Sequence, residues 1–91
     1  MLTVVSYDIV DDRRRTRVAQ VLKDFGVRVQ YSVFECHLDL SQLAALDRRV
    51  RGAIDEAKDS VRMYRVCQEC AAKTVIVGTG ELSDDPSVYV V

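Results

Sequence analysis

The segment at residues 2–8 most constrains the fold of this chain, because it predicts a strand that is apolar on both faces. It reads LTVVSYD and is rich in β-branched and aromatic side chains, which favour strands. Leu2 and Val4 would share one face of this strand, and Val5 and Tyr7 the other. A strand with apolar groups on both faces is typical of the middle of a sheet, so we expect neighbouring strands on either side.

The next segments predict a helix followed by extended chain. Asp11 or Asp12 can cap the helix, and Gly26 is a natural stop for it. Its apolar residues recur at helical spacing, at Val18, Val21, Leu22 and Phe25. Residues 27–40 are extended, and their apolar positions change parity near Ser32–Phe34. This change indicates a bulge or a tight turn, and either one bent strand or two short strands would fit it.

The second half of the chain also predicts a helix followed by strands. Ser41 can cap a second helix, which would bury Leu43, Leu46, Val50, Ala53, Ile54 and Ala57. Residues 61–66 predict a strand, 67–73 a short turn or helix, and 74–77 a further strand. An acidic, glycine-containing loop follows, and the apolar residues 88–91 form a last β-like segment.

This order, β-α-β(β)-α-β with extra C-terminal strands, predicts an α+β protein with the ferredoxin-like βαββαβ plan. We expect two amphipathic helices to cover one face of a small, mainly antiparallel sheet. Residues 1–78 would form this domain, and residues 79–91 a C-terminal tail and strand. The exposed VYVV terminus would invite aggregation of a lone subunit, so we expect it to pack on the partner in a homodimer.

Composition and charge exclude several classes of protein. The 91 residues suffice for one domain, and 48% hydrophobic with 30% charged residues is wrong for a disordered chain. No stretch approaches the roughly 20 apolar residues of a membrane span, and the N-terminus lacks the basic region of a signal peptide. We therefore expect a cytoplasmic protein with no membrane partner. The net charge of −1 conceals a basic segment, since residues 13–28 hold six cations and one acid.

The three cysteines predict no disulfide scaffold, because their number is odd and no export signal is present. Cys67 and Cys70 form a CxxC pair, but a zinc site needs four ligands and the one histidine, His37, lies far away in the chain. A redox CxxC that opens a helix after a strand is one interpretation. The interpretation that we favour is two small, half-buried residues in a short turn.

The end of the first strand is the most informative place for chemistry. Asp8 would be held rigidly there, and hard cations such as Mg²⁺ bind one or two such carboxylates together with water and phosphate. The arginines that follow at the start of the helix are suited to gripping phosphate. Asp8 as a turn residue at the strand end is the alternative. For Asp11 and Asp12 we favour helix capping, and the arginines would then lie in solvent.

Other candidates for chemistry are weaker. His37 shares its parity with charged residues of its strand, so we expect it to be exposed, and no Ser/His/Asp or Cys/His arrangement accompanies it. Tyr31 and Phe34 flank the change in parity, where core packing is the role that we expect. A basic surface with few exposed aromatic residues favours contact with a nucleic-acid backbone over reading of bases.

Three segments in order resemble the second numbered family of CRISPR-associated (Cas) proteins. They are LTVVSYDI, DDRRRTRVAQVLKDFG and VRVQYSVFEC, which match a strand ending in Tyr-Asp-Ile, an Arg-rich helix and a Gln-x-Ser-Val-Phe-Glu strand. The segments DSVRMYRVCQEC and KTVIVG match the family's second half. The resemblance therefore covers about residues 1–78.

The resemblance implies a ferredoxin-like homodimer in CRISPR adaptation, also called spacer acquisition. Such a dimer holds duplex DNA beside an integrase partner, and many members are described as metal-dependent nucleases acting on RNA or DNA. The family's catalytic and metal-binding aspartate falls on Asp8, with Mg²⁺ or Mn²⁺ as the cofactor. The phosphate-binding arginines of the family fall on Arg13, Arg14 and Arg17.

The resemblance also places Tyr7, Ser32 and Phe34 near the cleft of the dimer. One Asp8 per chain is a poor metal site, so we expect a two-fold axis to bring two of them together. The metal would polarise a phosphodiester and activate a water, and arginines would stabilise the developing charge. Three functions remain open: a metal-dependent endonuclease, a scaffold that binds DNA without cutting it, and a regulatory domain that binds a small molecule.

Overall fold

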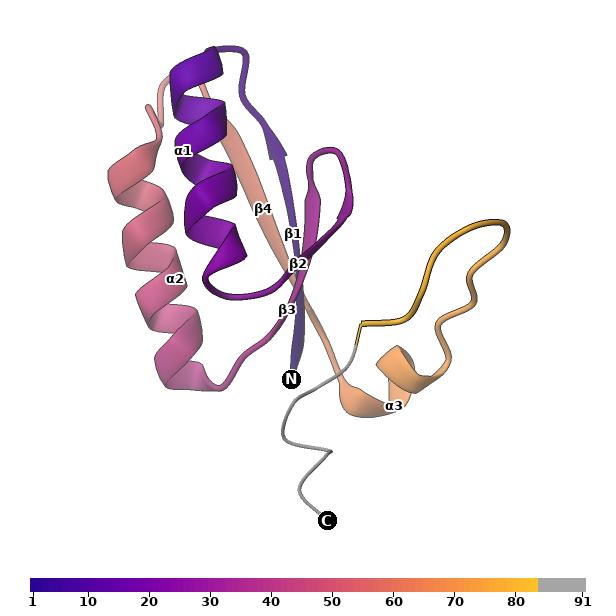
Figure 1. Cartoon of the computed structure of the whole chain (residues 1–91). Coiled ribbons are helices and arrows are strands. Elements are labelled where there is room, and N and C mark those ends of the chain that lie inside the picture. The colour runs from indigo at the N-terminus through magenta and orange to yellow at the C-terminus, as the bar shows by residue number, and fades with distance from the viewer. Residues whose placement is uncertain (84–91) are drawn as a thin grey trace.

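The computed structural model describes residues 1–83, which form a four-stranded antiparallel sheet with two helices on one face (Figure 1). The elements are β1 (Leu2–Asp8), α1 (Asp12–Lys23), β2 (Val27–Gln30), β3 (Val33–His37), α2 (Leu40–Ala53), β4 (Ser60–Val66) and α3 (Gln68–Ala72). The strands lie in the order β2-β3-β1-β4, and each neighbouring pair is antiparallel. The predicted ferredoxin-like α+β plan is confirmed.

The strand β1 lies between β3 and β4, which confirms its predicted central place. Val5 is opposite Phe34 on one side and Met63 on the other. Val5 and Tyr7 are buried under the helices, whereas the alternate residues of β1 face the opposite side of the sheet. We call that second side the open face, because neither α1 nor α2 covers it (Figure 1).

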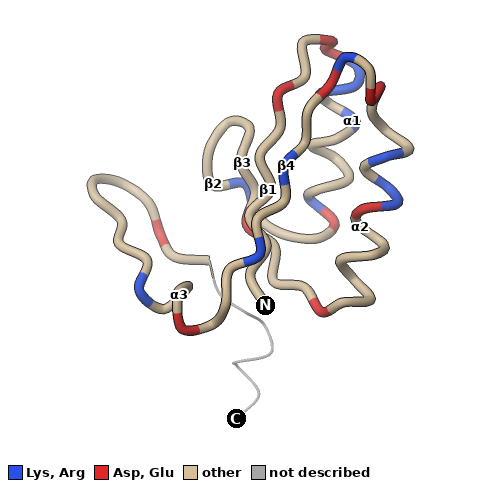
Figure 2. The backbone as a smooth tube through the Cα atoms, turned by 180° about the vertical axis from the view of Figure 1, so that it is seen from behind, with Lys and Arg blue, Asp and Glu red and all other residues tan. Residues whose placement is uncertain are grey.

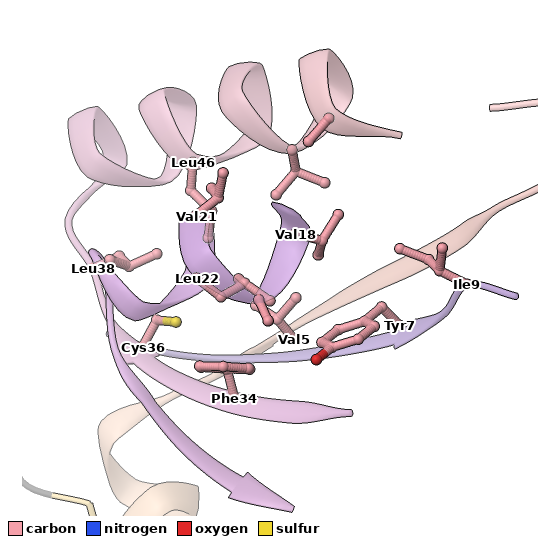
Figure 3. Close-up of a cluster of buried hydrophobic side chains, with 13 residues drawn as sticks. Val5, Tyr7, Ile9, Val18, Val21, Leu22, Phe34, Cys36, Leu38 and Leu46 are labelled. Carbon is pink, nitrogen blue, oxygen red and sulfur yellow. The ribbon is translucent and has the colours of Figure 1, made fainter. Parts of the chain in front are cut away.

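The core fills the space between the sheet and the two helices. Val5, Phe34 and Cys36 point from the strands toward Leu22 of α1 and Leu46 of α2 (Figure 3). All five side chains have an exposed fraction of 0%. Burying a large apolar side chain contributes about 1.5–3 kcal/mol, so this layer holds both helices to the sheet.

The change in parity near Ser32–Phe34 is a hairpin turn between two short strands. Tyr31 and Ser32 form the turn, and the pairing of β2 with β3 shifts by one residue between Arg28 and Gln30. This resolves the choice between one bent strand and two. The expected core packing of Tyr31 is wrong: the residue is 73% exposed, because it lies at the hairpin tip beyond the cover of the helices.

The helix caps differ in part from those expected. Asp11 caps α1, as predicted, by accepting the Arg14 N–H at 2.9 Å. The expected cap at Ser41 is wrong, because Asp39 caps α2 by accepting the Gln42 N–H at 2.7 Å. The Gln42 side chain in turn accepts the Asp39 N–H at 2.9 Å, so two otherwise unpaired amide groups are satisfied reciprocally.

The predicted apolar stripe of α2 is largely confirmed. Leu46, Val50 and Ala53 are buried, and Leu43 and Ile54 are partly buried against them. Ala57 is exposed instead of buried, because α2 ends at Ala53.

The backbone of Gly26 runs unusually close to β3. Helix α1 ends before it, at Lys23, and the Gly26 N–H donates to the Leu22 carbonyl at 3.0 Å. A Cβ atom at Gly26 would lie 2.6 Å from Cys36 Sγ and 2.8 Å from Cys36 Cα, and closer still to the Glu35 carbonyl oxygen. Its φ is not positive. Glycine is therefore required here by close approach and not by a left-handed turn.

The segment after α3 differs from the sequence prediction. The expected strand at 74–77 is wrong, since these residues form no strand and Val75 and Val77 are 80% and 92% exposed. The reason is that no strand of residues 1–83 pairs with them. The short helix expected at 67–73 is confirmed as α3. The β-like segment expected at 88–91 lies outside the described residues.

The chain ahead of residue 84 returns to the open face of β3. Ser83 Oγ lies 3.1 Å from His37 Nε2 and also donates to Glu35. His37 is therefore half-buried instead of exposed as expected. None of the helices in residues 1–83 has the length and apolar character to cross a membrane.

Candidate functional site

Asp8 is the last residue of β1 and lies at the rim of the open face. It is opposite Ser60 of β4 and shares its side of the sheet with Leu2, Val4 and Ser6. Its side chain is exposed, and within residues 1–83 it makes no hydrogen bond or ion pair. The sheet thus presents a carboxylate whose oxygens are available to a ligand.

Arg62 of β4 is the cation that the strand register places nearest to Asp8 on the same face. It lies opposite Ser6, and so diagonally across from Asp8, at the separation of about 7–8 Å that long side chains can span. Its Nη1 donates to the Tyr64 hydroxyl at 3.2 Å, and this hydrogen bond raises the pKa of Arg62. Arg62 was not among the residues predicted from the sequence. The alternation along residues 61–66 was the signal that could have found it.

Tyr7, Ser32 and Phe34 hold the end of β1 against the hairpin between β2 and β3. The Tyr7 N–H donates to the Ser32 carbonyl at 3.1 Å, and the Tyr7 hydroxyl donates to the Tyr31 carbonyl at 3.3 Å. The rings of Tyr7 and Phe34 lie 6.4 Å apart between centroids. Because Tyr7 is 5% and Phe34 0% exposed, these side chains fasten the hairpin turn beside Asp8 and do not line an open surface.

Arg14 points into an ion pair and not into solvent. Its Nε and Nη2 donate to the two carboxylate oxygens of Asp59 at 2.7 and 3.2 Å. The Asp59 side chain is only 1% exposed and also accepts the Asp55 N–H at 2.8 Å. The hydrogen bond from Arg14 holds the pKa of Asp59 below its usual value. Arg14 therefore ties α1 to the start of β4, and Asp59 was not predicted from the sequence.

Arg13 and Arg17 lie on the exposed side of α1, around a shallow depression shared with Thr16 and Gln20. No carboxylate of residues 1–83 is within ion-pair distance of either arginine, nor of Arg48 on α2. We call Arg13, Arg17 and Arg48 the exposed arginines. Figure 2 shows cations along both helices. The exposed arginines are in the helix layer, across the sheet from the face that carries Asp8.

Comparisons with known proteins identify the family. The family model described as CRISPR associated protein Cas2 matches residues 1–74. A protein of Chloroflexus aurantiacus named CRISPR-associated endoribonuclease Cas2 3 is 54% identical over 91 residues, which cover 100% of this chain and 98% of that protein. This chain belongs to the Cas2 family.

Two further Cas2 proteins agree in sequence and in fold. CRISPR-associated endonuclease Cas2 2 of Thermus thermophilus is 44% identical over 89 residues, or 98% of this chain and 94% of that protein. The crystal structure of Streptococcus pyogenes Cas2 at pH 6.5 matches with a TM-score of 0.76 at 31% identity, over 86% of this chain and 100% of that one. The resemblance noted in the sequence is thereby confirmed.

Within one chain, the acidic residues of positions 1–83 do not by themselves enclose a metal ion. Residues 1–83 contain no group of three or more His, Cys, Asp or Glu side chains placed to bind one. Mg²⁺ accepts one or two carboxylates and completes its shell with water and phosphate, so the exposed Asp8 is suited to such a site. Two copies of Asp8, from two chains, would fit Mg²⁺ or Mn²⁺ better than one.

Proposed function

We propose that this Cas2 chain serves CRISPR adaptation as a homodimer that binds duplex DNA together with an integrase partner. Membership of the Cas2 family supports a role in CRISPR function, and the integrase partner is what the resemblance noted in the sequence implies. The exposed arginines support the DNA contact, because their guanidinium groups are not engaged by the acids of residues 1–83. This availability for phosphate is the observation that carries the proposal.

The exposed arginines suit the backbone of a duplex and not its bases. Arg13 and Arg17 are one helical turn apart on α1, and Arg48 adds a third cation on α2. Guanidinium groups bind phosphate oxygens in a bidentate manner, and such interactions carry no sequence information. We expect binding that tolerates any DNA sequence and weakens as salt rises.

The salt dependence of DNA binding tests this proposal. In the double variant Arg13→Gln/Arg17→Gln, the slope of log K against log salt should fall by about 0.9 for each phosphate that is no longer neutralised. Arg51→Gln is the matched control, because Arg51 also lies on the surface of α2 but is already paired with Asp47 and Glu56. A double variant that keeps the wild-type slope would remove α1 from the DNA interface.

We infer the homodimer from the open face, which carries exposed apolar groups as well as Asp8 at its rim. This face carries the half-buried Val4 of β1 together with Tyr64 of β4, which is 51% exposed. A second copy would cover these apolar groups and bring a second Asp8 to the same assembly. We expect sedimentation equilibrium to give twice the mass of one chain, and a monomer at micromolar concentration would contradict the dimer.

Hydrolysis of phosphodiesters is a second candidate function, favoured by the exposed Asp8 at a rigid strand end. When bound there, Mg²⁺ or Mn²⁺ would supply a Lewis acid for the phosphate. Asp8 would hold the ion, and Arg62, on the same face, would orient the anionic phosphate. RNA and DNA remain alternative substrates, because both carry the phosphodiester that these two residues would engage.

The variant Asp8→Asn distinguishes the two functions. We expect it to retain DNA binding and to lose any Mg²⁺- or Mn²⁺-dependent cleavage of RNA or duplex DNA. Asp47→Asn, which changes an exposed acid on α2, should leave both activities unchanged. Undiminished cleavage by Asp8→Asn would take Asp8 out of catalysis. If the wild-type protein supports spacer acquisition but cleaves neither RNA nor DNA, only the scaffold function remains.

Arg62 can be tested against a neighbour on its own strand. Arg62→Gln should reduce metal-dependent cleavage, because Arg62 shares the open face with Asp8. Arg65→Gln is the control, since Arg65 is opposite Thr3 and projects to the other side of the sheet. Equal losses in the two variants would argue against a specific role for Arg62.

A further inference from the structure

Two cysteines lie where the chain leaves the sheet. Cys67 directly follows β4, and Cys70 lies within α3, which connects the sheet to residues 74–83 (Figure 1). Both side chains are free thiols and both are exposed, not half-buried as expected from the sequence. The third cysteine, Cys36, is free but fully buried in the core. The exposed pair has no part in the proposed binding of DNA or metal.

The geometry of the pair brings the two sulfurs onto the same side of one turn. The Cys70 N–H donates to Cys67 Sγ at 3.4 Å, and the Ala71 N–H donates to the Cys67 carbonyl at 2.9 Å. These bonds hold Cys67 and Cys70 at the i, i+3 spacing of a helical turn, where Cβ atoms are about 5–6 Å apart. A disulfide needs Cβ atoms about 3.5–4.5 Å apart, so its closure also draws the two residues of this short turn closer together.

The two thiols are unequal in acidity. The Cys70 backbone N–H lowers the pKa of the Cys67 thiol, and the hydrogen bond to Cys67 raises the pKa of Cys70. Burial raises the pKa of Cys36 to about 11. Because the thiolate is the reactive form, Cys67 is the nucleophile of the pair, Cys70 is placed to resolve a mixed disulfide, and Cys36 is inert.

We propose that Cys67 and Cys70 are a reversible dithiol site, oxidised to an intrachain disulfide by exchange with a low-molecular-weight disulfide. The Cys67 thiolate attacks one sulfur of that disulfide, forms a mixed disulfide and releases one thiolate. Cys70 then loses its proton, attacks Cys67 Sγ and releases the second thiolate. The small disulfide gains two electrons and ends as two thiols, and the protein loses two thiol hydrogens.

Metal binding by a single chain explains this pair less well. Residues 1–83 hold no third His, Cys, Asp or Glu side chain beside the two thiols in a metal-binding arrangement. A closed structural zinc site takes four ligands. Dithiol oxidation needs only the two sulfurs that the structure brings together.

The experiment uses the full chain and oxidised glutathione. After exposure near neutral pH, unreacted thiols are alkylated and the peptides are analysed by mass spectrometry. We expect a Cys67–Cys70 disulfide that dithiothreitol reverses, with Cys36 alkylated only after denaturation. Wild-type protein that stops at a glutathione adduct, or that forms cross-links between chains instead, would overturn the proposal.

Two serine variants test the order of attack. Cys70→Ser should accumulate the glutathione adduct on Cys67, because no resolving thiol remains. Cys67→Ser should form an adduct on Cys70 more slowly than Cys70→Ser forms one on Cys67, since the acidified thiol is gone. Cys36→Ala is the control and should react as the wild type does. Equal rates in Cys67→Ser and Cys70→Ser would refute the assignment of Cys67 as nucleophile.

Discussion

The close approach of Gly26 to β3 predicts that a single methyl group there strongly destabilises the protein. In Gly26→Ala the new Cβ would lie 2.8 Å from Cys36 Cα, whereas ordinary contact begins at 3.4 Å. The obstructing atoms include backbone of a strand inside the hydrogen-bonded sheet, so no side-chain rotation relieves the clash. The strand must retreat by more than half an ångström. Overpacking of this kind costs typically 1–3 kcal/mol, and we expect about 3 kcal/mol.

Gly52→Ala is the matched control and should have the opposite sign. Gly52 lies in the last turn of α2, and a Cβ there would meet nothing within 4 Å. Replacing a helical glycine by alanine stabilises by about 0.5–1 kcal/mol. The free energy of unfolding would be measured by urea titration at one protein concentration, because dimer stability depends on concentration. A Gly26→Ala variant within about 0.5 kcal/mol of wild type would refute the close-packing argument.

Three further predictions concern the stability effects of the buried Thr3 and Cys36 and of the paired Asp59. Thr3→Val should stabilise by about 1 kcal/mol in urea titration, because the buried Thr3 hydroxyl has no hydrogen-bond partner within residues 1–83. Since Arg14 lowers the pKa of Asp59, that acid stabilises the fold above its usual pKa of 3.8 and ceases to do so as pH falls through the lower folded value. In Asp59→Asn, the melting temperature should therefore fall less steeply as pH is lowered below about 4. A fall as steep as in the wild type would contradict this. The raised pKa of Cys36 has the opposite effect on the pH dependence of stability. The free energy of unfolding should fall as pH rises from about 9 to about 11, and Cys36→Ala should remove that fall.

Strands could be predicted from the sequence where the apolar pattern of a single segment determines its structure. The two-sided apolar character of residues 2–8 predicted the central place of β1, and the parity change predicted a bulge or a tight turn near Ser32–Phe34, which the structure shows to be the hairpin turn at Tyr31 and Ser32. The cap of α2 was also present in the sequence, as Asp39 followed by Gln42 at the capping-box spacing, although Ser41 was predicted instead. The strand expected at 74–77 failed for a different reason. Its composition favours a strand, but a strand forms only where another segment pairs with it.

The exposure of Asp8 could be predicted from the sequence, whereas the pairing of the charged residues near it could not. A carboxylate at the end of an alternating strand has to project from the rim of the sheet, and the structure shows it exposed there. The ion pair of Arg14 with Asp59 joins residues 45 positions apart, and no local spacing rule connects them. For Arg62, the alternation along residues 61–66 could indicate its face of the strand, but its place near Asp8 follows from the register of β4 on β1. Such pairings are properties of the assembled sheet.

The central position of β1 also determines when the chain can finish folding during synthesis. Leu2 pairs with His37 on one side and with Val66 on the other, so β1 is made before the other three strands of this sheet and is fully enclosed only when β4 joins it. A nascent chain must therefore keep β1 incompletely paired until β4 has emerged from the exit tunnel. Translational pausing before β4 would prolong the exposure of an apolar strand, and chaperones that bind extended apolar peptides would find their target in β1.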